Sequence, residues 1–480
     1  MPDRPNILLI TTDQQRFDTI HAAGNPKIRT PHLNWLLDGG VRFARCYSDA
    51  PLCVATRATI MTGRHGYTNN LTSNAAEPRP IQPETSLPGL LTRAGYQTRA
   101  QGKMHFNPMR CTYGFEQWEI LEHYYRELAR HPEFGTPKDH GIGENEMEPV
   151  VSTVPESHSL THWTVRRSVD FLETRDPDRP FFLWTSFAKP HPPLDPCEPY
   201  WRMYENVDVP MPVTGDWSQR PEDVPPAYMQ GTWHLNQCDR FDDELIRATR
   251  RAYYACITQI DYNLGLLFAR MRELGLFENT LILFTSDHGD MMGDHHMGAK
   301  MNFFEGSAHI PMLVRGPREL IPEALCGTTC AGLANPADVY TTAMAAAGVE
   351  IPENWPVDGL DLLAMARGEA ERPRLHGQCM NSHAVLEGSY KYMFHEAGGT
   401  EMLFDLETDP MEQHELIRAG GHADVLERMR GRLVERLGPD HAAVRDGAPV
   451  ATAPEPEERE VRARSWPGYH SIGVPADVLH

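Results

Sequence analysis

The sequence predicts an α/β fold in which helices flank a parallel sheet, followed by a smaller C-terminal part built on an antiparallel sheet. Continuous apolar runs are typical of strands buried on both faces of a parallel sheet, and they occupy residues 6–11, 180–187, 280–285 and 310–314. Amphipathic segments with helical spacing stand between these runs, at His162–Glu173 and Asp242–Leu274. From about residue 370 apolar and polar residues alternate, which indicates antiparallel strands.

Residues that begin or end regular elements predict further segments near the N-terminus. Thr30–Leu37 has a proline near its start and a Gly-Gly pair after its end, which predicts a helix. A second helix, Leu87–Ala94, is stopped by glycine and followed by a strand at Tyr96–Ala100. Residues 107–160 and 196–228 are rich in proline, and we expect irregular loops that shape a substrate site or face a partner.

The C-terminal part has a different residue pattern from the α/β part. Val385–Phe394 and Glu401–Leu406 alternate around a Gly-Gly turn, which predicts an antiparallel hairpin, and a helix follows at Asp424–Leu437. The tail from residue 440 is rich in Pro, Glu and Ala, a composition that predicts no regular structure. We therefore divide the chain into a large α/β domain, a small subdomain and an extended tail, at residues 1–368, 369–440 and 441–480.

Composition bears on partners and compartment. The net charge of −21 argues against nucleic acid or an anionic membrane as partner. No apolar run approaches the about 18 residues of a transmembrane helix, and the N-terminus lacks the parts of a signal peptide. We therefore expect a cytoplasmic protein. The nine cysteines do not look like a disulfide framework, although Cys326 and Cys330 could pair.

The stretch PLCVATRATIMTGR places a lone cysteine, Cys53, four residues before Arg57. It predicts a short helix with Thr56 and Thr59 capping its first turn and Gly63 ending it. The Cys53 side chain would then lie beside the free N–H groups of a helix N-terminus, where negative charge is stabilised. On the cysteine alone, a buried structural thiol is an equally good explanation.

Polar residues follow four of the predicted strands, and these residues are Asp13 and Gln14, Lys103 and His105, His191, and Asp287 and His288. Because the carboxyl ends of parallel strands lie at one edge of a sheet, we expect these side chains to converge. Carboxylate and amide oxygens with one imidazole suit Ca²⁺, Mg²⁺ or Mn²⁺. The Lys and His residues, with Lys300, supply the charge that sulfuryl or phosphoryl transfer needs. Taken singly, Asp13 could cap a turn and Lys300 could be a solvated surface lysine.

Several blocks of the chain resemble the type I sulfatases of the alkaline phosphatase superfamily. CVATRATIMTGR is similar to the family signature Cys-x-Pro/Ala-x-Arg followed by Thr-Gly-Arg. The other blocks match in order and spacing, and they are ILLITTDQ, LLTRAGYQTRAQGKMHF, KPHPP, TSDHGDMMGDHHMGAKMNFFEGSAHIPMLVRGP, DVYTTAMAAAGV and LFDLETDP. The resemblance implies an alkaline-phosphatase-like sandwich with a large mixed, mostly parallel sheet. GKMHF and the Asp-His pair are most similar to bacterial choline-sulfatase-like members.

The resemblance also implies a metal site and a modified residue. In this family the cysteine at the position of Cys53 is oxidised to formylglycine by a formylglycine-generating or anaerobic sulfatase-maturating enzyme. Its hydrate coordinates one divalent metal, for which Ca²⁺ is the first expectation and Mn²⁺ or Mg²⁺ the alternatives. The implied ligands, besides residue 53, are Asp13, Gln14, Asp287 and His288.

Each remaining residue of the site has an implied role in cleaving a sulfate ester. Arg57 orients the hydrate, and metal-assisted deprotonation gives an alkoxide that attacks sulfur in line. Sulfate oxygens are held by Lys103, Lys300 and Asn74. His191, with Lys300, protonates the leaving alcohol. His105 then deprotonates the second hydroxyl, so that sulfate leaves and the aldehyde returns.

The predicted activity is hydrolysis of an alkyl, aryl or sugar sulfate monoester. One alternative is a phosphonate monoester or phosphodiester hydrolase with the same site, which GKMHF disfavours. The other is an inactive metal- and anion-binding relative whose Cys53 stays a thiol. Ala55 replaces the more usual proline, which bears on whether Cys53 is converted, and Gln14 replaces the commoner aspartate.

The leaving alcohol is expected to contact the two long insertions and the C-terminal hairpin. Aromatic residues there could hold a cation, stack on a sugar or belong to the core, and they are Tyr124, Tyr125, Trp201 and Trp233. The proline-rich tail could contact a second subunit in a homo-oligomer.

Overall fold

The computed structural model describes residues 4–74, 81–106, 108–137 and 139–456. In this part of the chain a central sheet has nine strands, which are Asn6–Asp13 (β1), Val41–Tyr47 (β2), Gln97–Gly102 (β3), Gln117–Ile120 (β4), Phe181–Pro190 (β5), Thr280–Ser286 (β6), His309–Ile310 (β7), Met312–Arg315 (β8) and Thr328–Ala334 (β9). Their order is β4-β3-β5-β1-β6-β8-β2-β7, with β9 beside β2. The five neighbouring strands β4, β3, β5, β1 and β6 pair in parallel, whereas β8 is antiparallel to both β6 and β2. The predicted mixed, mostly parallel sheet is confirmed.

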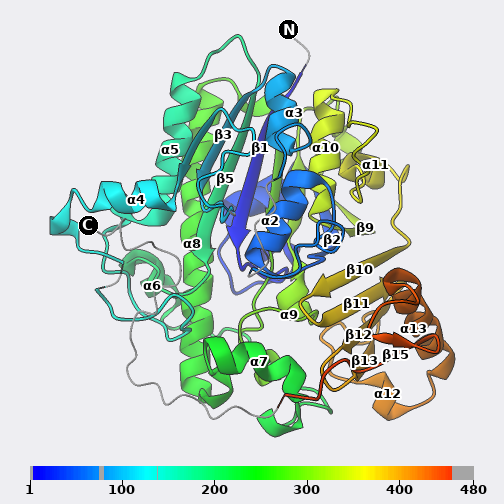
Figure 1. The fold of residues 1–480 in the computed structure, drawn as a ribbon. Helices are drawn as coiled ribbons and strands as arrows, with labels where there is room; N and C mark the ends of the chain where they lie inside the picture. The colour runs from blue at the N-terminus through cyan, green and yellow to red at the C-terminus, as the bar shows by residue number, and fades with distance from the viewer. Residues whose placement is uncertain (1–3, 75–80, 107, 138, 457–480) are drawn as a thin grey trace.

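Helices cover both faces of this sheet (Figure 1). One layer contains Pro31–Asp38 (α1), Leu160–Thr174 (α5) and Asp243–Glu273 (α8), and the other contains Cys53–Thr62 (α2), Leu87–Arg93 (α3), Ala337–Ala347 (α10) and Leu362–Ala366 (α11). Leu8 and Ile10 pack in the core with the first layer, while Ile7 and Leu9 pack with the second. Each fully buried side chain of this kind contributes about 1.5–3 kcal/mol, which explains why β1 is apolar without interruption.

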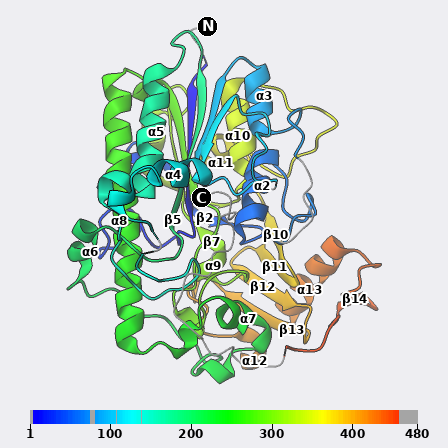
Figure 2. The ribbon, with the colours of Figure 1, turned by 60° about the vertical axis from the view of Figure 1, so that its left-hand side comes forward.

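The C-terminal part is a second, antiparallel sheet beside the first (Figure 2). Its strands are Arg374–Cys379 (β10), Ser382–Glu387 (β11), Tyr390–His395 (β12) and Thr400–Asp405 (β13). Tyr392 and Phe394 face the helix Ala423–Leu437 (α13), whereas Met393 faces the core shared with the α/β part. The single strand predicted over Val385–Phe394 is wrong, because Gly388, with a φ of 63°, turns the chain between β11 and β12.

A buried lysine joins the two sheets. Lys391 on β12 is fully buried, and its Nζ lies 2.7 Å from a carboxylate oxygen of Glu412. It also pairs with Glu305, in the short helix Glu305–Ala308 (α9), and donates to the Phe303 carbonyl at 2.9 Å. The second oxygen of Glu305 lies 2.6 Å from Nδ1 of His309 at the start of β7. The C-terminal sheet is therefore tied to the central sheet through buried charges.

The long insertions carry more structure than expected. Residues 107–160 contain β4, which extends the sheet beyond β3, and the helix Leu121–Leu128 (α4). Residues 196–228 contain Glu198–Tyr204 (α6) and the start of Pro226–Leu235 (α7). Tertiary packing outweighs the proline-rich composition here, because the apolar side of α4 packs against Trp163 of α5.

One further predicted strand is interrupted, and the possible cysteine pair does not form. The strand predicted over residues 310–314 is broken at Pro311, which has no N–H for a sheet ladder, into β7 and β8. All nine cysteines are free, so Cys326 and Cys330 do not pair.

Residues 444–449 of the predicted tail form a small antiparallel pair, Val444–Arg445 (β14) and Ala448–Pro449 (β15). Residues 457–480 of that tail lie outside the described residues. Among the described helices, none has the length and apolarity of a membrane span. The division at residues 368 and 440 stays a prediction.

Candidate active site

The four strands that carry polar residues at their ends are neighbours in the sheet. Strands β3, β5, β1 and β6 are adjacent and parallel, so their carboxyl ends meet at one edge. Asp13 ends β1, Asp287 follows β6, Lys103 follows β3 and His191 follows β5. The structure brings them together as the strand pattern predicts.

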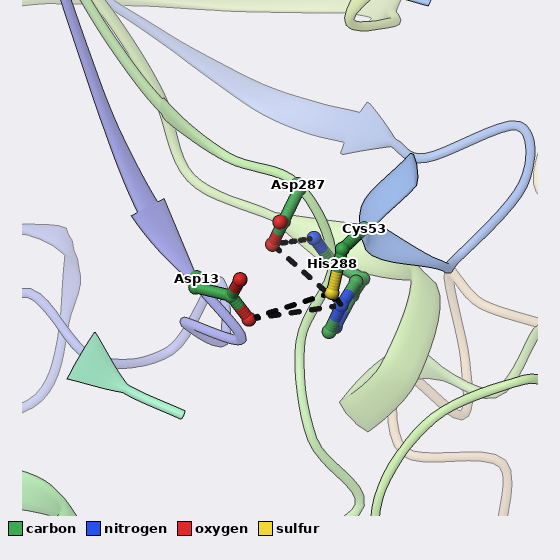
Figure 3. A group of neighbouring side chains, drawn as sticks. All are labelled: Asp13, Cys53, Asp287 and His288. Carbon is green, nitrogen blue, oxygen red and sulfur yellow. Dashed lines mark hydrogen bonds and ion pairs between the residues drawn. The ribbon is translucent and has the colours of Figure 1, made fainter. Parts of the chain in front are cut away.

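Four buried side chains form the centre of the site. Asp13, Cys53, Asp287 and His288 point toward one another from β1, α2 and the loop after β6 (Figure 3). Their donor atoms all lie within 4.8 Å of one another. The Cys53 Sγ is 3.1 Å from His288 Nε2 and 3.7 Å from an Asp13 oxygen, and His288 Nε2 is 3.7 Å from an Asp287 oxygen.

This donor set fits a divalent cation. Burial, and then the neighbouring Asp13, raise the pKa of the Asp287 carboxyl, because two enclosed carboxylates repel each other. Burial alone would also raise the pKa of Asp13, but the nearby charges of Lys103 and Arg57 hold it well below its usual value. A cation among these oxygens would offset the remaining repulsion, and oxygen ligands with one imidazole suit a hard metal.

Gln14 lies at the same edge of the sheet, and both the oxygen and the nitrogen of its side-chain amide are hydrogen-bonded. Its Oε1 accepts a hydrogen bond from Lys300 Nζ at 2.6 Å, and its Nε2 donates to the carboxylate of Asp290. The orientation of the amide is fixed, because an ammonium only donates and a carboxylate only accepts. The backbone of Gln14 has a φ of 71° and its N–H donates to Asp287 at 3.1 Å.

The sequence pattern did not single out Asp290, which is the second acid of the run Ser-Asp-His-Gly-Asp. Besides Gln14, its carboxylate accepts from the backbone N–H groups of Met292 at 2.8 Å and Ala299 at 3.1 Å. Asp290 therefore fixes both the Gln14 amide and the backbone next to Lys300.

Arg57 connects the acids to the neighbouring strands. It is almost fully buried, and its Nε donates to Asp287 at 3.0 Å while Nη2 lies 3.4 Å from Asp13. Nη1 donates to the hydroxyl of Ser186 at 2.7 Å and to the Lys103 carbonyl. Ser186, on β5, is a second residue that sequence analysis missed. These bonds fix the guanidinium beside the Cys53 side chain.

Helix α2 begins at Cys53, as predicted, and ends at Gly63, whose φ of 68° is left-handed. The predicted caps are wrong, because the hydroxyls of Thr56 and Thr59 donate to backbone carbonyls and the N-cap residue makes no side-chain bond. Instead, the Oδ1 of Asn74 accepts from the second backbone N–H of the helix at 3.1 Å. Asn74 is exposed, so it stands at the mouth of the site.

The surroundings of Cys53 favour an anion. Burial and the charge of Asp13 raise the pKa of its thiol, but Lys103, His288 and a hydrogen bond with His105 outweigh them and hold that pKa well below its usual value. Lys103 is itself close, with its Nζ 2.5 Å from an Asp13 oxygen. An anionic group at position 53 is therefore stabilised from several sides.

His191 and Lys300 form a hydrogen-bonded pair at the same edge of the sheet. Burial, then the charges of Lys300 and Lys103, lower the pKa of His191 well below its usual value, so the ring is neutral. Its Nδ1 lies 2.8 Å from the Pro192 carbonyl and its Nε2 lies 3.0 Å from Lys300 Nζ. Nδ1 therefore carries the hydrogen, and Nε2 accepts a proton shared by Lys300.

The aromatic residues of the insertions have mostly core positions. Tyr124 is buried against Trp163, while Trp201 and Trp233 are partly buried against apolar clusters. Tyr124 and Tyr125 also line a cavity that reaches Lys103 and His191.

Known proteins resemble the chain over most of its length. The Sulfatase family model matches residues 5–349. The arylsulfatase of Clostridium perfringens is 31% identical over 92% of this chain and 96% of its own, and the choline-sulfatase of Rhizobium meliloti is 32% identical over 85% of this chain and 81% of its own.

Solved structures share the fold. The phosphonate monoester hydrolase of Agrobacterium radiobacter has a TM-score of 0.77 at 24% identity and covers 94% of this chain and 100% of its own. A structure in complex with its substrate D-glucosamine-2-N,6-O-disulfate has a TM-score of 0.72 at 21% identity, over 90% of this chain and 97% of its own. The family match and the two relatives above 30% identity show that this chain belongs to the Sulfatase family of the alkaline phosphatase superfamily.

Proposed function

We propose that this sulfatase cleaves a sulfate monoester with a formylglycine formed from Cys53 and one divalent cation, with Ca²⁺ as the first candidate. The observation that carries the proposal is the enclosure of the Cys53 Sγ with two carboxylates and an imidazole, all within 4.8 Å. Asp13, Asp287 and His288 would hold the cation, with the Gln14 oxygen beside them. When bound, the cation supplies Lewis acidity that favours an ionised hydroxyl at position 53.

The chain's own residues then bind and orient the ester. Arg57 is fixed by its bonds to Asp287 and Ser186, and it holds the side chain at position 53 in place. The ammonium group of Lys103 lies against Asp13 and that of Lys300 against Gln14, and with the exposed Asn74 amide they would bind sulfate oxygens. Positive charge aimed at these oxygens stabilises the sulfuryl group as the ester bond breaks.

Two histidines provide the proton steps. The proton that Lys300 shares with His191 Nε2 can pass to the oxygen of the leaving alcohol. His105 hydrogen-bonds the side chain at position 53 and is exposed on the substrate side. It can therefore take the proton that must leave position 53 before sulfate is released.

The substrate class is a small alkyl, aryl or sugar sulfate. A sugar sulfate is supported by the structural neighbour bound to D-glucosamine-2-N,6-O-disulfate. A maturating enzyme is a required partner in this proposal, because the oxidation of Cys53 needs one.

Asp287→Ala is expected to remove the bound metal and to lower kcat/KM for an aryl sulfate by about 10³-fold or more. The alanine removes an oxygen ligand and one of the two carboxylate partners of Arg57. Metal content is measured by inductively coupled plasma mass spectrometry and activity in parallel. Asp424→Ala, on the exposed side of α13, is the matched control. Full metal content and activity in Asp287→Ala would refute the ligand assignment.

A phosphonate hydrolase is the second candidate, favoured by the fold neighbour of that name. We expect kcat/KM for 4-nitrophenyl sulfate to exceed that for 4-nitrophenyl phenylphosphonate by about tenfold, a difference of about 1.4 kcal/mol in the barrier. Both probes release the same phenol, so the ratio reports only the transferred group. Faster turnover of the phosphonate would replace the sulfatase assignment by the second candidate.

A further inference from the structure

A cavity of about 90 Å³ opens beside the sulfate-binding residues. Its lining includes Lys103 and His191 and, from the 107–160 insertion, Tyr124, Tyr125 and Glu144. Helix α4, which carries the two tyrosines, lies beside α5 in both views (Figures 1 and 2). The volume is several times the about 10–15 Å³ that one water needs, so the cavity can take the alcohol part of a small ester.

The cavity is lined by two acidic residues with different surroundings. Asp195 pairs with Lys189 and lies 3.5 Å from the His140 ring. Glu144 has no such pairing, and its Oε2 is buried without a hydrogen-bond partner among the described residues. A buried carboxylate oxygen without a donor is costly, which points to a donor that arrives with the substrate.

Two lysines near Glu144 are already engaged with other groups. Lys103 pairs with Asp13, and Lys300 bonds Gln14 and His191. Burial raises the pKa of the Glu144 carboxyl, although the charges of Lys103, His105 and Lys300 act to lower it. Glu144 therefore lies within electrostatic reach of the sulfate-binding residues and has room in front of it for a further cation.

We propose that Glu144 selects sulfate esters of amino alcohols by binding a protonated amine on the leaving group. A protonated amine supplies both the N–H donor that Oε2 lacks and a charge that balances the carboxylate. Such an ester is a zwitterion with no net charge. It therefore escapes the long-range repulsion that a protein of net charge −21 exerts on a simple anion.

The test compares 2-aminoethyl sulfate with propyl sulfate, in which a methyl group replaces the ammonium. This inference rests on the proposed sulfate hydrolysis. The amino ester is expected to have a kcat/KM about 10- to 100-fold higher, the range for a hydrogen bond to a charged group. Choline sulfate, which is also a zwitterion but whose quaternary ammonium has no N–H, is expected to be cleaved less well than 2-aminoethyl sulfate.

Glu144→Gln is expected to remove this preference and to change kcat/KM for propyl sulfate by less than about threefold. Glu133→Gln is the matched control, because Glu133 belongs to the same insertion but is exposed and does not line the cavity. It is expected to leave the preference unchanged. Glu144→Gln is also expected to keep or raise the melting temperature, whereas a structural role for Glu144 would lower it.

Equal rates for the two esters, or an unchanged preference in Glu144→Gln, would overturn the inference and leave sulfate hydrolysis standing. Failure to cleave any sulfate, including an aryl sulfate, would instead contradict the proposed function. Calorimetric binding of the two esters then tests Glu144 without turnover. Tighter binding of the amino ester that is lost in Glu144→Gln supports the inference, and equal affinities contradict it.

Discussion

Cys53→Ala is expected to lower kcat/KM for an aryl sulfate by about 10⁴-fold or more, as removal of a nucleophile does in other enzymes. The alanine leaves Arg57 and Lys103 in place, so binding of sulfate should persist while turnover is lost. Cys46→Ala is the matched control, because Cys46 is also a buried thiol but lies on β2, in the apolar core. It is expected to keep activity within a few-fold of the parent.

The chemical state of residue 53 can be read from one peptide. Trypsin cleaves after Arg45 and Arg57, which releases residues 46–57 with both Cys46 and Cys53. After unfolding and alkylation, a converted chain is expected to carry one alkyl group, on Cys46, and an aldehyde at position 53. Two alkyl groups on this peptide, in protein from the native host, would refute the formylglycine proposal. Ala55 makes this measurement decisive, because it departs from the more usual proline.

Lys391→Met is expected to lower the free energy of unfolding by about 3–5 kcal/mol, the cost of breaking a buried ion pair from one side. Lys391 is fully buried between Glu305 and Glu412, and methionine has similar length but no charge. Glu305 would keep His309 and Tyr47 as side-chain partners, whereas Glu412 would lose its ammonium partner. The change is measured by urea unfolding, followed at a wavelength that reports the whole chain.

The pH dependence of this variant has a definite sign. Burial raises the pKa of Glu412 to about 7 even with Lys391 present, and removal of the lysine raises it further. A carboxyl whose folded pKa lies above its unfolded value stabilises the fold at low pH and loses that effect as pH rises. Lys391→Met should therefore be more destabilising at pH 8 than at pH 5.

Two further variants distinguish the charge from its side-chain packing. Adding Glu412→Gln to Lys391→Met is expected to restore part of the lost stability, because one uncompensated carboxylate disappears. Arg432→Met removes a half-exposed partner of Glu387 and is expected to cost less than about 1 kcal/mol. A Lys391→Met variant as stable as the parent, or one unaffected by Glu412→Gln, would contradict the role given to this network.

The central sheet and the core of the site could be predicted because their signals are local. A strand buried on both faces must be continuously apolar, as β1 and β6 are, and the polar residues after it mark its end. Strands β2 and β4 and helix α4 could not be predicted, because their stability comes from packing against distant segments. The caps on α2 were mispredicted for a related reason, since Thr56 bonds a carbonyl outside the helix.

The residues that support the site were also beyond prediction. Asp290, Ser186 and Lys391 act through partners far away in the chain, and no spacing rule connects such positions. Glu144 stands in an insertion without a decodable motif. Its relevance depends on a cavity that exists only once α4 has packed.

The shared bonds of Gln14 and Asp290 have a consequence for how this site can change in evolution. Aspartate at position 14 would place one carboxylate against another, since Gln14 donates its amide hydrogen to Asp290. Asparagine at position 290 would leave Lys300 alone to orient the amide, because asparagine both donates and accepts. Substitutions at the two positions are therefore coupled, and relatives with aspartate at position 14 are expected to have a neutral residue or a donor at position 290.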